Sequence, residues 1–168
     1  MVGVSVGCAA AAGIAQSRPA TIEPRTRANG MLVVQGSSRQ SQASLFGAIC
    51  DPVVLKPGRR TRTCAPVGRV SRLFVGYGLF APLGQIEREW KAVGWKLWLD
   101  GQPVDLDAFG TSDRVLSKYP PADFKDVVLR EWSIVLVDPT PGRHTIRYRA
   151  GGREGATDTS WVFRVRSS

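Results

Sequence analysis

The chain of 168 residues offers few side chains whose type and spacing could support catalysis. Its single histidine, His144, stands one residue before an expected strand. Nucleophilic catalysis would need a serine or cysteine beside His144, and a metal site would need further ligands, but no motif in the sequence supplies either. No glycine-rich phosphate loop is present, because Gly76 and Gly78 fall inside an expected strand. We therefore expect a protein that is not an enzyme and that uses no cofactor.

The stretch from Asp105 to Asp113 offers three carboxylates and a glycine, a composition that could bind calcium. Hard oxygen donors at alternating positions suit Ca²⁺, and Gly110 would let the chain wrap sharply. The candidate ligands are Asp105, Asp107 and Asp113, although their spacing lacks the terminal bidentate acid of an EF-hand loop. Aspartate is also frequent in ordinary turns, because its side chain hydrogen-bonds the neighbouring backbone. A calcium-dependent binding module and a simple acidic turn both stay open at this point.

Cys50 and Cys64 bracket a loop that contains a Pro57-Gly58 turn. A metal site would need cysteines two residues apart with histidines nearby, and none are present, so the choice lies between a disulfide and two free thiols. In an exported protein we expect the disulfide. Closing a loop of about 15 residues would stabilise the fold by roughly 3 kcal/mol.

The amino-terminal stretch 1–15 is small, apolar and uncharged, and it resembles the end of a bacterial export signal. Cys8 follows Gly7 as in a lipoprotein processing site, where the cysteine would become lipidated, whereas residues 13–15 resemble an ordinary signal-peptidase site. No basic residue precedes the apolar stretch, and Ser5 stands where a lipoprotein signal has a large aliphatic residue, so a disordered terminus without a targeting role is a third alternative. We expect an extracellular or cell-envelope location, with membrane attachment only through a lipid on Cys8, and a cytoplasmic location is the alternative. No stretch approaches the roughly 20 apolar residues of a membrane-spanning helix.

The formal net charge of +9 is unevenly distributed along the chain. Residues 1–70 carry nine Lys and Arg against two acids, whereas residues 71–168 carry fourteen against twelve. The excess falls in the part that looks least like a folded domain. This argues against direct nucleic-acid binding, because a nucleic-acid module places its basic residues on a folded face among aromatic residues. The alternative is a polyanion-binding or nucleic-acid-binding protein with a basic arm, and it would depend on Arg59, Arg60 and Arg62.

Two stretches carry the clearest strand patterns. Residues 95–106 alternate around an Asp-Gly pair, which favours a tight β-hairpin turn. Residues 70–80 alternate strictly and place Gly76 and Gly78 on one face. Two glycines leave a flat strip, which could be a shallow groove for a sugar or an extended peptide, or a slot filled by one of the protein's own tryptophans. The residues that could bind a ligand are Gly76, Gly78, the neighbouring Trp98 and, in a rigid loop beside two prolines, Tyr119.

A helical period interrupts the strands over residues 84–93, where Ile86, Trp90 and Val93 fall on one face. We expect a short helical crossover there. A long apolar strand is expected over 127–137, where it ends at a proline-rich turn.

The sequence from Pro141 to Tyr148 reads Pro-Gly-Arg-His-Thr-Ile-Arg-Tyr, a turn that leads into a strand, and the aromatic-rich stretch 161–165 would close the sheet. This pattern resembles bacterial immunoglobulin-like domains of secreted and cell-surface proteins. The resemblance implies a two-sheet sandwich and an exported setting, and it carries no catalytic residues.

We therefore predict an all-β fold, an immunoglobulin-like sandwich of two sheets and about seven strands with one short helical crossover. The sandwich would occupy residues 48–168, after the export-like start and a basic flexible linker over 1–47. Residues 31–34 in that linker could form an added edge strand or stay an apolar island in a disordered arm. The predicted function is that of a non-enzymatic accessory or interaction module of the cell envelope or cell surface, with a protein or a glycan as its partner.

Overall fold

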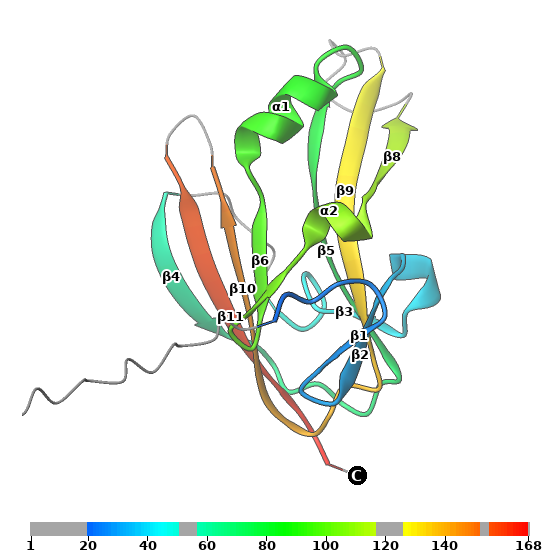
Figure 1. Cartoon of the computed structure of the whole chain (residues 1–168), viewed down its shortest axis with the longest axis vertical. Coiled ribbons are helices and arrows are strands. Elements are labelled where there is room, and N and C mark those ends of the chain that lie inside the picture. Colours follow the sequence, from blue (N-terminus) through cyan, green and yellow to red (C-terminus); the bar gives the residue numbers. More distant parts are fainter. Residues whose placement is uncertain (1–19, 51–56, 117–125, 152–154, 168) are drawn as a thin grey trace, which may run out of the picture.

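The structure is a computed structural model that describes residues 20–50, 57–116, 126–151 and 155–167. Two mixed β-sheets face each other and enclose a hydrophobic core between them (Figure 1). The mainly β, two-sheet architecture agrees with the sequence prediction. The described ranges contain eleven strands, which is more than the predicted number of about seven.

The first sheet, which we call the β9 sheet, is built around β5 (Arg72–Pro82) and β9 (Val127–Val137). These two long antiparallel strands pair along their whole length. The shorter strands of this sheet are β1 (Thr26–Ala28), β2 (Met31–Gln35), β3 (Ala43–Ser44) and β8 (Thr111–Leu116). On the side of β9 away from β5, β2 pairs with the end of the strand and β8 with its start. A short 3₁₀ helix, η1 (Ser38–Gln40), follows β2.

The second sheet, which we call the β10 sheet, contains, in spatial order, β4 (Gly58–Thr63), β11 (Thr157–Val165), β10 (Gly142–Ala150), β6 (Lys96–Leu99) and β7 (Gln102–Val104). β4 runs parallel to β11, and the other neighbours are antiparallel. Side chains alternate strictly between the two faces. Ile146 and Tyr148 of β10 are buried, whereas Arg143 and Arg149 are exposed. The β10 sheet therefore has one core face and one solvent face.

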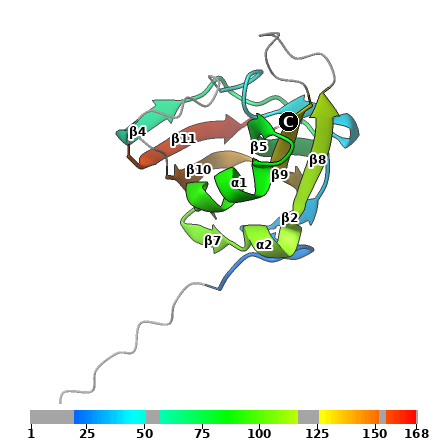
Figure 2. The same cartoon turned by 90° about the horizontal axis from the view of Figure 1, so that it is seen from above.

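Two helices carry the chain from one sheet to the other on the same side of the sandwich (Figure 2). α1 (Ile86–Val93) joins β5 to β6 and confirms the predicted helical crossover. Its Ile86 packs against Ala81 and Val128 of the β9 sheet. α1 ends at Gly94, whose φ of 56° is a left-handed conformation that glycine adopts readily. No helix in the described ranges is long and apolar enough to cross a membrane.

The second helix, α2 (Leu106–Phe109), joins β7 to β8 and was not predicted. It begins after Asp105, whose carboxylate accepts a hydrogen bond of 3.1 Å from the Ala108 N–H. The turn preference of aspartate, visible in the sequence, therefore starts a one-turn helix.

The predicted hairpin around the Asp-Gly pair is confirmed by β6 and β7. Leu99 pairs with Gln102. Asp100 and Gly101 between them have φ angles of 49° and 82°, the positive values that this dipeptide tolerates. Leu99 is buried, and Trp98 projects from the opposite, outer face.

Residues 20–47 belong to the folded domain, which corrects the prediction that they form a flexible linker. Met31 and Val33 are both 0% exposed, and β2 forms ladder pairs with β9. The apolar residues 31–34 thus belong to a strand, and this strand lies between β1 and β9, not at the edge of the sheet. The surrounding Arg and Ser residues gave the segment a linker-like composition, while its alternating apolar side chains supply part of the core.

The predicted disulfide between Cys50 and Cys64 is present, with the two Cα atoms 4.5 Å apart. Cys50 follows β3 of the β9 sheet, and Cys64 comes directly after β4 of the β10 sheet. The bond therefore links the two sheets covalently.

Candidate functional site

The outward face of the β10 sheet carries a concentration of basic side chains. Along β10, Arg147 and its neighbours at alternate positions project outward because the residues between them are buried. The strand register places Arg164 opposite Arg143 and Lys96 opposite Arg149. Residues in opposite positions of adjacent strands project from the same face of a sheet. We call this surface the basic face, and its cations are Arg59, Lys96, Arg143, Arg147, Arg149 and Arg164.

A single carboxylate lies among these cations in the described part of the basic face. Asp158 stands in register with both Arg59 and Arg149, and it accepts hydrogen bonds of 2.7 and 2.6 Å from Arg147. The hydrogen bonding from Arg147 lowers the pKa of Asp158 most, and the positive charges of Arg59 and Arg149 lower it further. The lowered pKa of Asp158 thus indicates a positive electrostatic potential on this face. The cations outnumber the single carboxylate, so the face has a net positive charge.

Trp98 lies on the basic face, where the guanidinium of Arg147 sits 4.8 Å from its ring centroid. This cation–π contact holds the Arg147 guanidinium over the indole, and two nitrogens of the same guanidinium donate hydrogen bonds to Asp158. The half-buried Trp98 therefore acts as a support for a charged side chain.

Two shallow depressions extend the basic surface beyond the end of β11. One of about 410 Å³ is lined by Arg69, Arg166 and one carboxylate, Asp138, among others, and its neighbour of about 670 Å³ by Arg164 and Arg166. Cations therefore continue from the sheet face around its lower end.

The arginines of β10 and β11 were missed by the sequence reasoning, although a signal for them exists. Residues 142–150 alternate between core residues and polar or basic residues, which predicts one basic face if the stretch is a strand. The count of charges over residues 71–168 concealed this basic face, because the acidic residues that balance its positive charge in the count lie elsewhere in the fold.

The predicted groove at Gly76 and Gly78 is filled by the protein itself. A Cβ atom on Gly76 would lie 2.5 Å from the ring of Phe74, and one on Gly78 would lie 2.6 Å from the carbonyl oxygen of Arg130. Phe74 covers Gly76, and β9 residues cover Gly78, so no tryptophan occupies this strip. Trp98 belongs to the other sheet, so the structure does not bring it together with the two glycines. Tyr119 lies outside the described residues.

The predicted calcium ligands are not assembled into a site. Asp105 caps α2, and Asp113 accepts hydrogen bonds of 2.8 and 2.7 Å from Arg130. Hydrogen bonding from Arg130 lowers the pKa of Asp113. Asp107 is exposed on α2. Across the described ranges, no group of three His, Cys, Asp or Glu residues could hold a metal ion.

The predicted polyanion cluster on β4 is divided by strand alternation. Arg59 is in register with Asp158 and joins the basic face, whereas Arg60 and Arg62 are in register with Thr159 and Trp161, whose side chains are buried. Arg60 also donates a hydrogen bond of 2.8 Å to the carbonyl of Pro57. Of the three predicted arginines, only Arg59 contributes to the basic face. The predicted lipidation residue, Cys8, lies outside the described residues.

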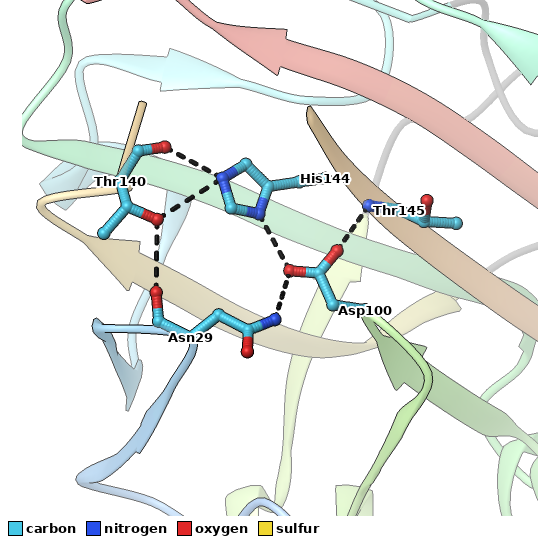
Figure 3. Close-up of polar contacts among 5 residues, drawn as sticks. All are labelled: Asn29, Asp100, Thr140, His144 and Thr145. Atoms are coloured by element: carbon cyan, nitrogen blue, oxygen red, sulfur yellow. Dashed lines mark hydrogen bonds and ion pairs between the residues drawn. The ribbon is translucent and has the colours of Figure 1, made fainter. Parts of the chain in front are cut away.

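His144 is the centre of a buried polar cluster at the lower end of the sandwich (Figure 3). Its Nδ1 lies 2.8 Å from the carboxylate of Asp100, and its Nε2 lies 2.8 Å from the carbonyl oxygen of Thr140. Asp100 also accepts hydrogen bonds from the Asn29 amide at 2.8 Å and from the Thr145 N–H at 2.7 Å. The cluster joins the β1–β2 turn, the β6–β7 turn and the start of β10.

Nδ1 of His144 faces a carboxylate and Nε2 faces a carbonyl oxygen, and because both are acceptors this geometry favours the protonated imidazolium form of the ring. The hydrogen bond to Asp100 raises the pKa of His144 against the opposing effect of burial. Burial alone would raise the pKa of Asp100, but the hydrogen bonds it accepts outweigh this and lower its pKa. The hydrogen bonds of His144 and Asp100 connect three turns that are far apart in the sequence, which gives this pair a structural role.

No family model matches the chain, and no curated protein matches it either. Two solved structures show a distant similarity. One, described as PbICP-C in complex with falcipain-2, is 14% identical, covers 69% of this chain and 95% of the other, and has a TM-score of 0.36. The other, the solution structure of amebosin, is 10% identical, covers 66% of this chain and 100% of the other, and has a TM-score of 0.25.

Proposed function

We propose that the protein is a non-enzymatic binding module that holds an anionic polysaccharide on its basic face. The observation that carries the proposal is the presence of six cations and one carboxylate on the described part of one sheet surface. Five of these cations are exposed, and only Arg147 is half-buried. A field of this kind attracts a polyanion and concentrates it along the sheet.

The shortage of free aromatic rings on the described part of the basic face indicates the class of ligand. Modules that bind single-stranded nucleic acid combine cations with aromatic rings on which bases stack. Trp98 is the aromatic residue of this face in the described ranges, and Arg147 sits over its ring. A sulfated or carboxylated polysaccharide needs charge and hydrogen bonds only, which the face supplies.

The cellular setting in the proposal is the cell envelope or the cell surface, where anionic polysaccharides occur. The Cys50–Cys64 disulfide supports an oxidising compartment. The resemblance of the sequence to immunoglobulin-like domains agrees with an exported sandwich, and that topology is part of the proposal. Attachment to a membrane would need the lipid anchor predicted at Cys8.

The proposal is tested by measuring the affinity for a size-defined heparin oligosaccharide as salt is varied. We expect the triple variant R143S/R149S/R164S to bind about tenfold to a hundredfold more weakly, because each exposed charge contact contributes roughly 0.5–1 kcal/mol. The salt dependence of its affinity should also become shallower, because fewer counterions are released on binding.

The matched control removes three exposed cations that lie off the basic face, in the variant R39S/R88S/R114S. This variant has the same net charge as the first and should bind heparin like the wild-type protein. Equal losses in the two variants would show that net charge alone drives binding and would overturn the proposal. Tighter binding of a single-stranded oligonucleotide than of heparin would favour the nucleic-acid alternative.

A further inference from the structure

A pocket of about 230 Å³ lies on the side of the sandwich where both helices cross between the sheets. Residues of both α1 and α2 line it. Three tryptophans are among its lining residues: Trp90 from α1, Trp95 from the link to β6 and Trp132 from the inner face of β9. The ring centroids of Trp90 and Trp95 are 5.2 Å apart, and those of Trp95 and Trp132 are 6.2 Å apart.

Two of these indoles keep a buried donor without a partner among the described residues. The Nε1 atoms of Trp95 and Trp132 are inaccessible to solvent and make no hydrogen bond there. Trp132 is only 1% exposed. With no accessible surface, these two N–H groups are not reached from the open pocket, so a ligand there would contact the indole rings and the polar side chains around them.

The remaining lining is mixed in character, with Leu106 as an apolar wall and with Lys91, Asp107 and Thr111 as polar groups. Apolar walls with a few convergent polar groups are typical of small-molecule sites. A pyranose ring fits this combination, because it has an apolar C–H face that can pack on an indole and hydroxyl groups that can hydrogen-bond to Lys91, Asp107 and Thr111. The volume suits one sugar unit and is too small for an extended chain.

A second depression connects this pocket to the basic face. It measures about 200 Å³ and shares Trp95, Leu106 and Asp107 with the pocket, and it reaches Lys96 and Trp98 on the basic face. A chain bound along the β10 sheet can therefore continue around the edge of β6 and β7 into the pocket.

We propose that the pocket lined by Trp90, Trp95 and Trp132 binds one pyranose unit, the end unit of the polysaccharide that lies on the basic face. The identity of the longer ligand rests on the proposed function, while binding of a single sugar is independent of it. In this proposal the basic face provides the charge-dependent part of the affinity, and the pocket determines which pyranose unit is bound.

The test uses the indole N–H signals of the five tryptophans in a ¹H–¹⁵N spectrum. The probes are the methyl glycosides of glucose, galactose, N-acetylglucosamine and glucuronic acid. We expect at least one of them to shift the signals of Trp95 and Trp132 in a saturable way. Trp161 is the internal control, because its Nε1 is also buried without a partner but the residue does not line the pocket.

The variant Trp90→Ala should abolish these shifts, because it removes the wall contributed by α1. Phe80→Ala, at an exposed aromatic residue of β5 that does not line the pocket, should leave them in place. If none of the four glycosides shifts Trp95 and Trp132, or if the shifts persist unchanged in Trp90→Ala, the proposed sugar site is wrong. If a variant loses its tertiary fold, dispersion of the backbone amide signals shows it, and Trp90→Phe then serves as the milder substitution, with weaker shifts expected.

The two proposals fail in different ways. Heparin binding that depends on the basic-face arginines, with no glycoside shift, would contradict the pocket and keep the basic face. Glycoside shifts without heparin binding would contradict the proposed function and keep the pocket.

Discussion

Both ring nitrogens of His144 make hydrogen bonds that hold parts of the fold together. Its side chain is 6% exposed and that of Asp100 is 13% exposed, so the pair is shielded from water. A buried ion pair stabilises a fold only when its remaining hydrogen-bonding groups are satisfied, and the contacts with Thr140, Asn29 and Thr145 meet this condition. Breaking the pair leaves a buried charge without its partner.

The pair predicts a specific pH dependence of stability. The pKa of His144 is raised above 6.5, so its contribution is complete below that pH and is lost as the pH rises through the pKa of the folded state. The pKa of Asp100 is lowered below 3.8, so its contribution is present above that pH and is lost as the pH falls through its lowered value. The pair therefore stabilises most between these two limits.

Urea denaturation of the wild type and His144→Gln at a series of pH values measures this effect. We expect the wild type to be more stable by about 2–4 kcal/mol near pH 6, with a difference that shrinks as the pH rises above the pKa of His144. Arg143→Gln, at an exposed neighbouring position, should differ from the wild type by an amount that does not vary with pH. A difference for His144→Gln that is constant across pH would contradict the imidazolium assignment.

Asp113 illustrates how a partner decides the role of a carboxylate. Arg130 holds it with two hydrogen bonds and also contacts Glu87 of α1, so the acidic group already has its cation. We expect neither added calcium nor a chelator to change the melting temperature, because a ligand stabilises only when it binds the folded state. A rise with calcium in the wild type that is absent in Asp113→Asn would restore the calcium site.

At the scale of elements, alternation was the most informative signal in the sequence. It predicted the strand of β5 and the β6–β7 hairpin, and a change to a helical period predicted α1. It failed where composition suggested a different state, as in β2, which is surrounded by Arg and Ser. β4 was missed because its residues 59–63 are all arginine or threonine. Without an apolar residue at every second position, the sequence gives no strand signal there.

The basic face could not be predicted from the sequence for a related reason. Arg59, Lys96, Arg143 and Arg164 lie on four different strands, and they meet only through the register of the sheet. A single sequence contains the alternation within each strand but does not state which strands are neighbours. The slot at Gly76 shows the same limit, because only packing reveals that Phe74 occupies it.

At the scale of the whole molecule, the two sheets depend on residues from both ends of the described chain. Ile22, Met31, Val33 and Leu45 are each at most 1% exposed and belong to the central core cluster. They come from the segment that composition assigned to a linker. The domain therefore extends well before residue 48.

Truncation tests this extent. A chain that starts at residue 48 should fail to unfold cooperatively, because loss of each large buried side chain costs about 2–5 kcal/mol and a domain has only about 5–15 kcal/mol in total. The full chain is the control and should unfold in one cooperative transition. A cooperative transition in the shorter chain would show that β1, β2 and β3 are dispensable.

The basic face is the central claim, and a map of backbone amide shifts on titration with a heparin hexasaccharide tests it most directly. The account predicts that the largest shifts lie on β10, β11 and β4, around Arg143, Arg149 and Arg59, and that they fade as salt is raised. The outer face of the β9 sheet, around Gly76 and Gly78, should stay unchanged. Shifts centred on that outer face, or no saturable shift at low salt, would contradict the account.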